Sequence, residues 1–232
     1  MAGDAFSHQE TAMQIVADLR EKIILGFFQE DPSARELALS EQYGVSRSTV
    51  RTALMTLEKD GLLTVLPNGR KRFETVDRDY IADLCRARSA IEGEAAAEIL
   101  QLKQVDYSEL LALLGSFHTA MEMELSPERR KLLAQTNEEF HEKLVALSGN
   151  RALVKCREVI APVLYTIEHL NAGLAAEKNE HNYYDSHRKI LDLLMNRDPA
   201  AVEYIRYHAM DAVLIDAMQV LGKEKDRKDG NV

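Results

Sequence analysis

A helix-turn-helix pattern near the N-terminus is the feature that most constrains how this chain can fold. A short amphipathic run over residues 35–43 ends at Gly44, and glycine suits the left-handed residue that follows a helix. Ser46 is a favourable N-cap for the next helix. The apolar stripe of that helix is formed by Val50, Ala53, Leu54 and Leu57. An earlier apolar repeat over residues 8–26 predicts one further helix before the pair.

A hairpin signal follows directly after this pattern. Two short extended runs, residues 62–66 and 70–76, flank Pro67-Asn68-Gly69, and Asn-Gly favours a tight hairpin because both residues tolerate positive φ. Beyond the hairpin no segment is typical of a strand, and the helical periods between five breaks predict about six helices. The fold class that we predict is mainly α, with a winged helix-turn-helix over residues 1–76 and an all-helical domain over residues 77–232.

Charge is distributed unevenly along the chain. The formal net charge of −9 argues at first against a nucleic-acid partner. Residues 32–73, however, contain seven basic and four acidic residues, or a net +3, so the rest of the chain carries −12. A locally basic module attached to an acidic body would approach DNA with one face only, because the phosphates repel the body.

The residues expected to read DNA lie on the helix that Ser46 begins. Arg47 and Arg51 are one turn apart beside the apolar stripe, on an outward-facing surface. The planar guanidinium of arginine can bind a phosphate or two acceptors on a guanine edge. The alternative is that both arginines are ordinary solvated residues. Arg35 and the basic run at 70–72 favour DNA binding, because they add flanking contacts to the DNA backbone.

Two motifs in this region resemble the GntR family of bacterial regulators. They are RELA at 35–38 and GVSRSTVRTALMTLEKDGLL at 44–63, and the resemblance extends over residues 10–75. It implies DNA contact by the three arginines and places the wing tip at Gly69. The full set of predicted DNA-binding residues is Arg35, Ser46, Arg47, Ser48, Thr49, Arg51 and Gly69. The expected assembly is a homodimer on a roughly palindromic double-stranded operator.

Three histidines of the predicted helical domain lie in apolar stripes. His141, His187 and His208 belong to three separate predicted helices, and Asn137 lies one turn before His141. A single inward histidine is more often a satisfied core residue than a metal ligand. Three imidazoles that converge in a bundle would instead make a site for zinc or a similar ion. We therefore predict a divalent metal, with zinc as the first choice and Asn137 as a fourth ligand, against the alternative of an ordinary bundle core.

A buried arginine is expected on the first helix of this domain. Arg88 shares a face with apolar residues, so either Glu92 at i+4 or an anionic ligand must meet its charge. RSAIE at 88–92, NEEFHEKLVALSGN at 137–150, SHRKIL at 186–191 and the later His208 resemble the C-terminal ligand-binding domain of the FadR-type branch of the GntR family.

This second resemblance implies an antiparallel helical bundle that dimerises, binds a divalent metal and recognises a small carboxylate touching that metal. Asn137 stands where the metal-binding members usually have Asp, so one negative charge is missing while a carbonyl oxygen remains. The stretch from His187 to His208 is about one residue short, which would turn His208 by about 100° unless the break at Pro199 absorbs it. A metal held by neutral ligands would keep its full charge and attract an organic acid, with Arg88 as effector-binding residue.

Other classes of protein fit the sequence less well. Glu138 to His141 forms Glu-x-x-His, half of a di-iron signature, but no second copy occurs, so we predict no enzyme. A metal-free regulator that senses a fatty acyl thioester is the closer alternative, and the hairpin disfavours a TetR-type regulator. Without an apolar run long enough for a bilayer or a signal-like start, we expect a cytoplasmic protein with no membrane partner. Cys85 and Cys156 are expected to be reduced core thiols.

Overall fold

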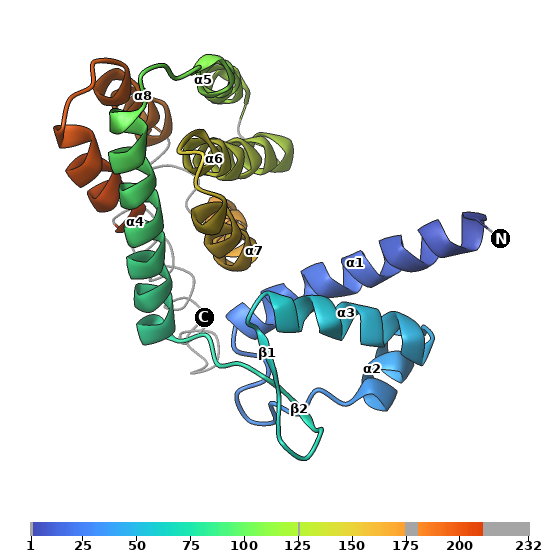
Figure 1. Ribbon diagram of the computed structural model, residues 1–232. Coiled ribbons are helices and arrows are strands. Elements are labelled where there is room, and N and C mark those ends of the chain that lie inside the picture. Colours follow the sequence, from blue (N-terminus) through green and yellow to red (C-terminus); the bar gives the residue numbers. More distant parts are fainter. Residues whose placement is uncertain (1, 125, 175–180, 211–232) are drawn as a thin grey trace, which may run out of the picture. The chain divides into compact units, whose positions relative to one another are not determined.

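The chain divides into two compact units in the computed structural model, which describes residues 2–124, 126–174 and 181–210 (Figure 1). The first unit ends at Tyr80 and the second begins at Ile81. No helix within the described ranges is long and apolar enough to cross a membrane.

The N-terminal unit is a winged helix-turn-helix, as the sequence predicts. Its elements are α1 (Ala2–Ile24), α2 (Glu36–Tyr43), α3 (Arg47–Lys59), β1 (Leu63–Val65) and β2 (Lys71–Phe73). Gly44 ends α2 with a φ of 63°, the left-handed conformation that a glycine adopts without strain. The two strands pair antiparallel with Leu63 opposite Phe73, and Ser33 forms an isolated bridge with Arg72. The wing is therefore attached to the segment that precedes α2.

Helix α3 is held in place by its apolar stripe, which packs mainly against α1. All four predicted stripe residues are fully buried, namely Val50, Ala53, Leu54 and Leu57. An ion pair of 2.6 Å between Arg20 Nη2 and Asp60 Oδ2 links α1 to the C-cap of α3. Helix α1 begins at Ala2, six residues before the predicted start, and ends at Ile24 close to the prediction.

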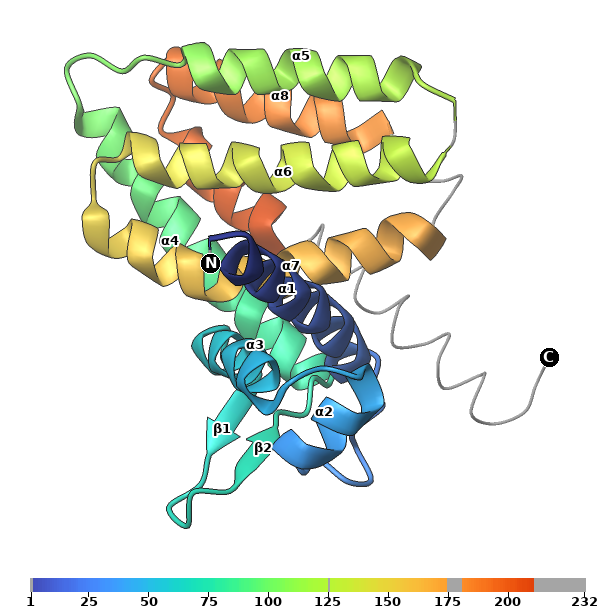
Figure 2. The same ribbon diagram turned by 90° about the vertical axis from the view of Figure 1, so that its right-hand side faces the viewer.

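The described part of the C-terminal unit contains six helical segments, the number that the sequence predicts. They are α4 (Arg78–Gln101), α5 (Ser108–Glu122), α6 (Pro127–Leu147), α7 (Arg151–Leu174), α8 (His181–Met195) and residues 200–210. Helix α6 packs against both α5 and α7, and α5 packs against α8. Figure 2 shows α5, α6 and α7 running side by side in alternating directions.

An apolar core joins α4, α5, α6, α8 and the segment 200–210. Its larger members include Phe117, Phe140, Leu144, Ile190 and Ile205. The buried side of α6 also carries the polar residues Asn137 and His141, which contact residues of α7 and α4. Cys85 is buried in this unit, but Cys156 on α7 is exposed, so the prediction that both cysteines are core thiols is wrong for Cys156.

Candidate functional site

The first turn of α3 presents the predicted reading surface. Ser46 is the N-cap, and its side chain accepts a hydrogen bond from the backbone N–H of Thr49 at 3.2 Å. The side chains of Arg47 and Arg51 are 64% and 58% exposed, and Ser48 is exposed beside them. Thr49 does not fit the predicted DNA contact, because its side chain is buried and pairs with His8 Nδ1 of α1 at 3.0 Å. Its place in the structure is to support the N-cap.

The carboxylate of Glu36 lies close to three basic side chains of this surface. One carboxylate oxygen lies 3.0 Å from Arg51 Nη2 and 3.9 Å from Arg47 Nη2, and the other accepts from Lys71 Nζ of the wing at 2.9 Å. Hydrogen bonds from Arg51 and Lys71 lower the pKa of Glu36 to about 2. Sequence reasoning missed this role, although Glu36 lies next to Arg35 inside the RELA motif.

A cavity of about 560 Å³ opens between the starts of α2 and α3 and the wing, and basic residues line much of it. Arg35 is the N-cap of α2; its side chain is 70% exposed and makes no capping hydrogen bond. Free N–H groups at a helix start attract phosphate. Gly69 at the wing tip has a φ of 75°, which favours glycine there, and no atom lies within 4 Å of where a Cβ would be. This side of the unit can therefore hold a phosphate backbone.

The three predicted histidines meet inside the C-terminal unit. His141 of α6 and His187 of α8 are fully buried, and their Nε2 atoms lie 3.2 Å apart. The ring of His208 stacks on that of His141 with centroids 5.3 Å apart, and it lies nearly perpendicular to the ring of His187. One candidate ligand atom from each residue lies within 4.8 Å of the other two. The short spacing before His208 therefore does not turn it away from the cluster.

This cluster has dimensions that suit a metal ion. Zinc–nitrogen bonds of 2.0–2.1 Å in a tetrahedral site place two ligand nitrogens about 3.4 Å apart, close to the observed 3.2 Å between His141 and His187. Burial lowers the pKa of His141 to about 4 and that of His208 to about 3. Both rings are consequently neutral at pH 7, the form that binds metal. The same 3.2 Å also fits a direct hydrogen bond between the two rings.

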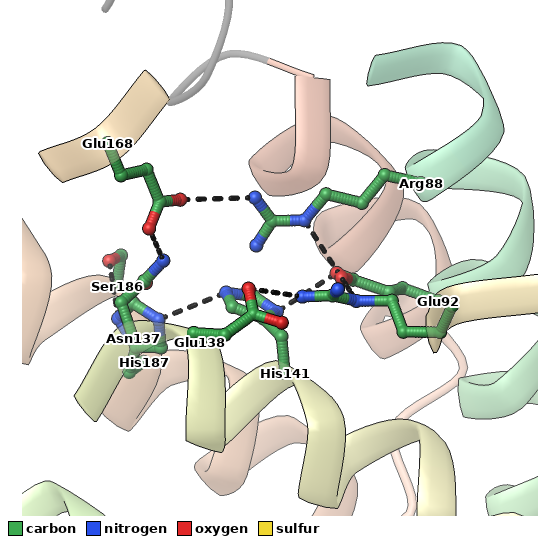
Figure 3. Close-up of polar contacts among 9 residues, drawn as sticks. Arg88, Glu92, Asn137, Glu138, His141, Glu168, Ser186 and His187 are labelled. Carbon is green, nitrogen blue, oxygen red and sulfur yellow. Dashed lines mark hydrogen bonds and ion pairs between the residues drawn. The ribbon is translucent and has the colours of Figure 1, made fainter. Parts of the chain in front are cut away.

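A network of buried charges surrounds His141 and its α6 neighbour Asn137 (Figure 3). Arg88 Nε donates to Glu92 Oε1 at 2.8 Å, and Arg88 Nη1 lies 3.4 Å from Glu168 Oε1. Glu92 Oε2 lies 3.0 Å from His141 Nδ1, while Glu168 Oε2 accepts from Asn137 Nδ2 at 2.6 Å. Burial would raise the pKa of Glu92, but Arg88 and His141 outweigh it and hold the pKa below its ordinary value. Glu92 is thus the i+4 partner that the sequence offered for Arg88.

Sequence reasoning missed two charged members of this network on α7. Arg157 Nη2 donates to Glu138 Oε2 at 2.8 Å and Arg157 Nε lies 3.4 Å from Glu92 Oε1, while Glu168 pairs with Asn137 and Arg88. Arg157 and Glu168 are eleven residues apart, which is about three helical turns, so they share one face of α7. The sequence signal that could have indicated this network is the position of Arg157 and Glu168, one at each end of an apolar stripe on α7. The prediction that only neutral groups surround the metal is therefore incomplete.

The winged helix-turn-helix with its basic surface, joined to a helical unit with a buried polar cluster, defines a DNA-binding transcription regulator with a ligand-binding domain. Residues 11–72 match the gntR family of bacterial regulatory proteins, and residues 83–211 match the FCD domain, which alone covers more than half of the chain. The chain belongs to the GntR family of transcriptional regulators and carries an FCD effector-binding domain.

Its relatives are regulators as well. An uncharacterized HTH-type transcriptional regulator of Agrobacterium vitis is 29% identical over 64% of this chain and 87% of its own length. The "Probable D-xylose utilization operon transcriptional repressor" of Paenarthrobacter nicotinovorans is 26% identical over 91% of this chain and 92% of its own. A solved structure of Lar, which controls the agr system of Listeria monocytogenes, shares the fold at a TM-score of 0.67 and 18% identity, over 88% and 95% of the two chains. These proteins and both families are regulators rather than enzymes, as predicted.

Proposed function

We propose that this regulator binds a roughly palindromic operator as a homodimer, and that a small organic acid controls this binding from a metal-containing pocket in the FCD domain. The observation that carries the sensing half is the cluster of His141, His187 and His208, to which Arg88 is linked through Glu92. The divalent metal, with zinc as first choice, would be held by the three imidazoles and the amide oxygen of Asn137.

The DNA-binding half is supported by the exposed side of α3. Arg47 and Arg51 are free of the protein core and lie beside the wing cation Lys71 through their shared partner Glu36. One such module contacts only a few base pairs, and two modules related by a two-fold axis would read the two half-sites of a palindrome. Arg35 and the uncapped start of α2 would hold the phosphates that set the register.

The charge of the pocket supports an anionic effector. Its five charged residues are Arg88, Arg157, Glu92, Glu138 and Glu168, whose formal charges add to −1. A divalent ion among the neutral histidines changes that value to +1, so an organic anion is attracted only when the metal is bound. One effector carboxylate would complete the metal shell, and Arg88 would bind a second acidic or polar group.

The fatty acyl thioester alternative fits this network less well. An acyl chain needs an apolar lining, whereas Arg88, Glu92 and Glu168 are buried charges and the neighbouring positions are imidazoles. Bringing an alkyl chain against these charges would cost free energy by removing their remaining polar partners. A small carboxylate is the better match.

Metal stoichiometry tests the sensing half. Elemental analysis of untagged protein that was never exposed to chelator should show about one divalent metal per chain, and added Zn²⁺, Mn²⁺ or Ni²⁺ should raise the Tm of chelator-treated protein. His187→Ala should remove this response. His118→Ala is the matched control, because His118 is 63% exposed on α5 and does not belong to the histidine cluster.

Two results would count against parts of this assignment. Metal content well below one per chain together with an unchanged Tm would refute the metal site and favour hydrogen-bonded histidines. Unchanged metal affinity in His187→Ala would refute the choice of ligands alone. A thermal-shift screen of small carboxylates, run with and without metal, then tests the effector class, since the charge argument requires binding only in the metal-loaded protein.

A further inference from the structure

Asn137 and Glu168 form a buried pair between α6 and α7. The Nδ2 atom of Asn137 lies 2.6 Å from Oε2 of Glu168, and both residues are only 4% exposed (Figure 3). Helices α6 and α7 pack extensively against each other, so the pair lies within a fixed interface. The second oxygen of Glu168 faces Arg88 Nη1 at 3.4 Å, which keeps a positive charge beside this carboxylate.

The contact decides which way the Asn137 amide is turned. An ionised carboxylate can only accept hydrogen bonds, so the NH₂ group of the amide must face Glu168. The carbonyl oxygen of Asn137 is then the end of the amide that is directed away from Glu168. His141 lies one turn further along the same side of α6, and its ligand nitrogen belongs to the histidine cluster.

The same contact explains how an asparagine can stand at this position. An aspartate at 137 would bring two carboxylates to hydrogen-bond distance, and such a pair cannot be fully ionised in a buried site. With Asn137 in place, the one carboxylate of the pair lies on α7 instead of α6. The negative charge near the histidines is therefore kept but moved to the neighbouring helix.

We propose that Glu168 is the positioning residue of the metal site: it orients Asn137 so that the amide oxygen serves as ligand, and it supplies the negative charge that an aspartate ligand would carry. The inference rests on the metal site proposed above. Glu92 Oε2 also lies 3.0 Å from His141 Nδ1, the nitrogen opposite to the one that meets His187, although the two atoms do not meet with hydrogen-bond geometry. Each α6 ligand therefore lies beside a buried glutamate of another helix, and Arg88 lies between the two acids.

A charge-swap cycle tests this proposal with Glu168→Gln, Asn137→Asp and the double variant. Two quantities are measured for each protein: the metal Kd by competition with a chromophoric chelator, and the Tm of the metal-free protein at pH 7.5. Loss of an outer-shell partner of this kind weakens metal binding by about 10–100-fold, which is the result expected for Glu168→Gln. Asn137→Asp should lower the metal-free Tm, because its new carboxylate faces Glu168.

The double variant carries the same net charge as the wild type with the two roles exchanged. We expect its metal-free Tm to lie near that of the wild type and its metal Kd to recover most of the loss, because the amide can again donate to the carboxylate. Glu142→Gln is the matched control: it removes one negative charge next to His141 in sequence, but its side chain is exposed. Its metal Kd should stay within about twofold of wild type, as for a charge screened by solvent.

Additive Tm losses in the double variant, or a Glu168→Gln Kd equal to that of Glu142→Gln, would overturn the proposal. If the wild-type protein binds no metal, the proposed sensing function fails and the ligand role of Asn137 fails with it. The metal-free Tm cycle still decides the orientation of the amide in that case, because coupling between positions 137 and 168 does not need a metal. Retained far-UV circular dichroism identifies variants that are folded.

Discussion

Removing Arg88 tests how the buried charges hold the FCD domain together. Arg88 is 1% exposed, and its partners Glu92 and Glu168 are 0% and 4% exposed. Arg88→Met keeps an apolar side chain of similar length in the space but leaves both carboxylates without their shared cation. Breaking a buried pair by removing one partner costs about 3–5 kcal/mol. Glu92 keeps its contacts to His141 and Arg157, and Glu168 keeps its contact to Asn137, so we expect the lower end of this range.

A loss of about 3 kcal/mol corresponds to a decrease of about 6–12 °C in the Tm of a domain of this size. Differential scanning calorimetry at pH 7 measures it. Arg86→Met is the matched control, since Arg86 lies on the same helix but is 65% exposed and pairs with the exposed Asp83, so its effect should stay below about 0.5 kcal/mol. Equal Tm values for the two variants would refute the view that Arg88 neutralises buried charge.

The difference in stability between wild type and Arg88→Met should depend on pH because of Glu92. Arg88 and His141 outweigh burial and hold the pKa of Glu92 below the 4.5 of an unperturbed side chain. A carboxylate of this kind stabilises the folded state above pH 4.5, and the stabilisation is lost as the pH falls further. The difference in stability between wild type and Arg88→Met should therefore narrow as the pH is lowered below 4.5. A difference that widens over this interval would contradict the assignment.

Two further predictions concern α3. Arg47→Ala and Arg51→Ala should each weaken binding to an operator obtained by in vitro selection by about 1–3 kcal/mol, measured by fluorescence anisotropy at fixed salt, and wild-type affinity in both would remove the support for this reading surface. Ser46→Ala should lower the free energy of unfolding of the N-terminal unit by about 1 kcal/mol in urea titrations, because an N-cap hydrogen bond is lost. The exposed Thr52→Ala should change it by less than about 0.5 kcal/mol, and an equal loss in both variants would show that the cap does not matter.

The fold could be predicted because its signals are local. Gly44 marks a helix end by its left-handed backbone, Ser46 marks a helix start by its capping side chain, and Gly69 marks the wing tip by its positive φ. Asn68 does not adopt the positive φ that a two-residue Asn-Gly turn would need. The inward positions of His141 and His187 follow from the helical period of the apolar residues around them. These signals need no knowledge of how the helices pack.

What the sequence could not predict depends on the rotation of one helix against another. Thr49 is buried because α1 brings His8 to that side of α3, and nothing near Thr49 in sequence signals this contact. Glu168 reaches Asn137 across 31 residues only because α7 packs on α6 with that face inward. A charge estimate made from the ligand residues alone consequently omitted the carboxylates that adjacent helices contribute.

Replacing Glu36 tests whether the arginines of α3 must be held in position to read DNA. It accepts from Arg51 and Lys71, and with a pKa of about 2 it stays ionised at every pH suited to DNA binding. Glu36→Gln has two opposite consequences. The added net positive charge strengthens binding to any duplex, because one further cation is available to phosphate. Arg51 also loses its charged partner, so its side chain must be ordered when DNA binds, which costs up to about 1.5 kcal/mol.

The added positive charge strengthens binding to every DNA sequence. The cost of ordering Arg51 applies only to a sequence in which Arg51 must contact a base edge. We therefore expect Glu36→Gln to tighten binding to an unrelated duplex several-fold and to leave operator affinity unchanged or weaker, so that the specificity ratio falls by up to about tenfold. Anisotropy with both duplexes at three salt concentrations measures the ratio, and Glu41→Gln, an exposed acid of the same helix, controls for charge alone. If Glu36→Gln changes both affinities by the same factor, as we expect for Glu41→Gln, then Glu36 contributes only charge and Arg51 needs no fixed partner to select its operator.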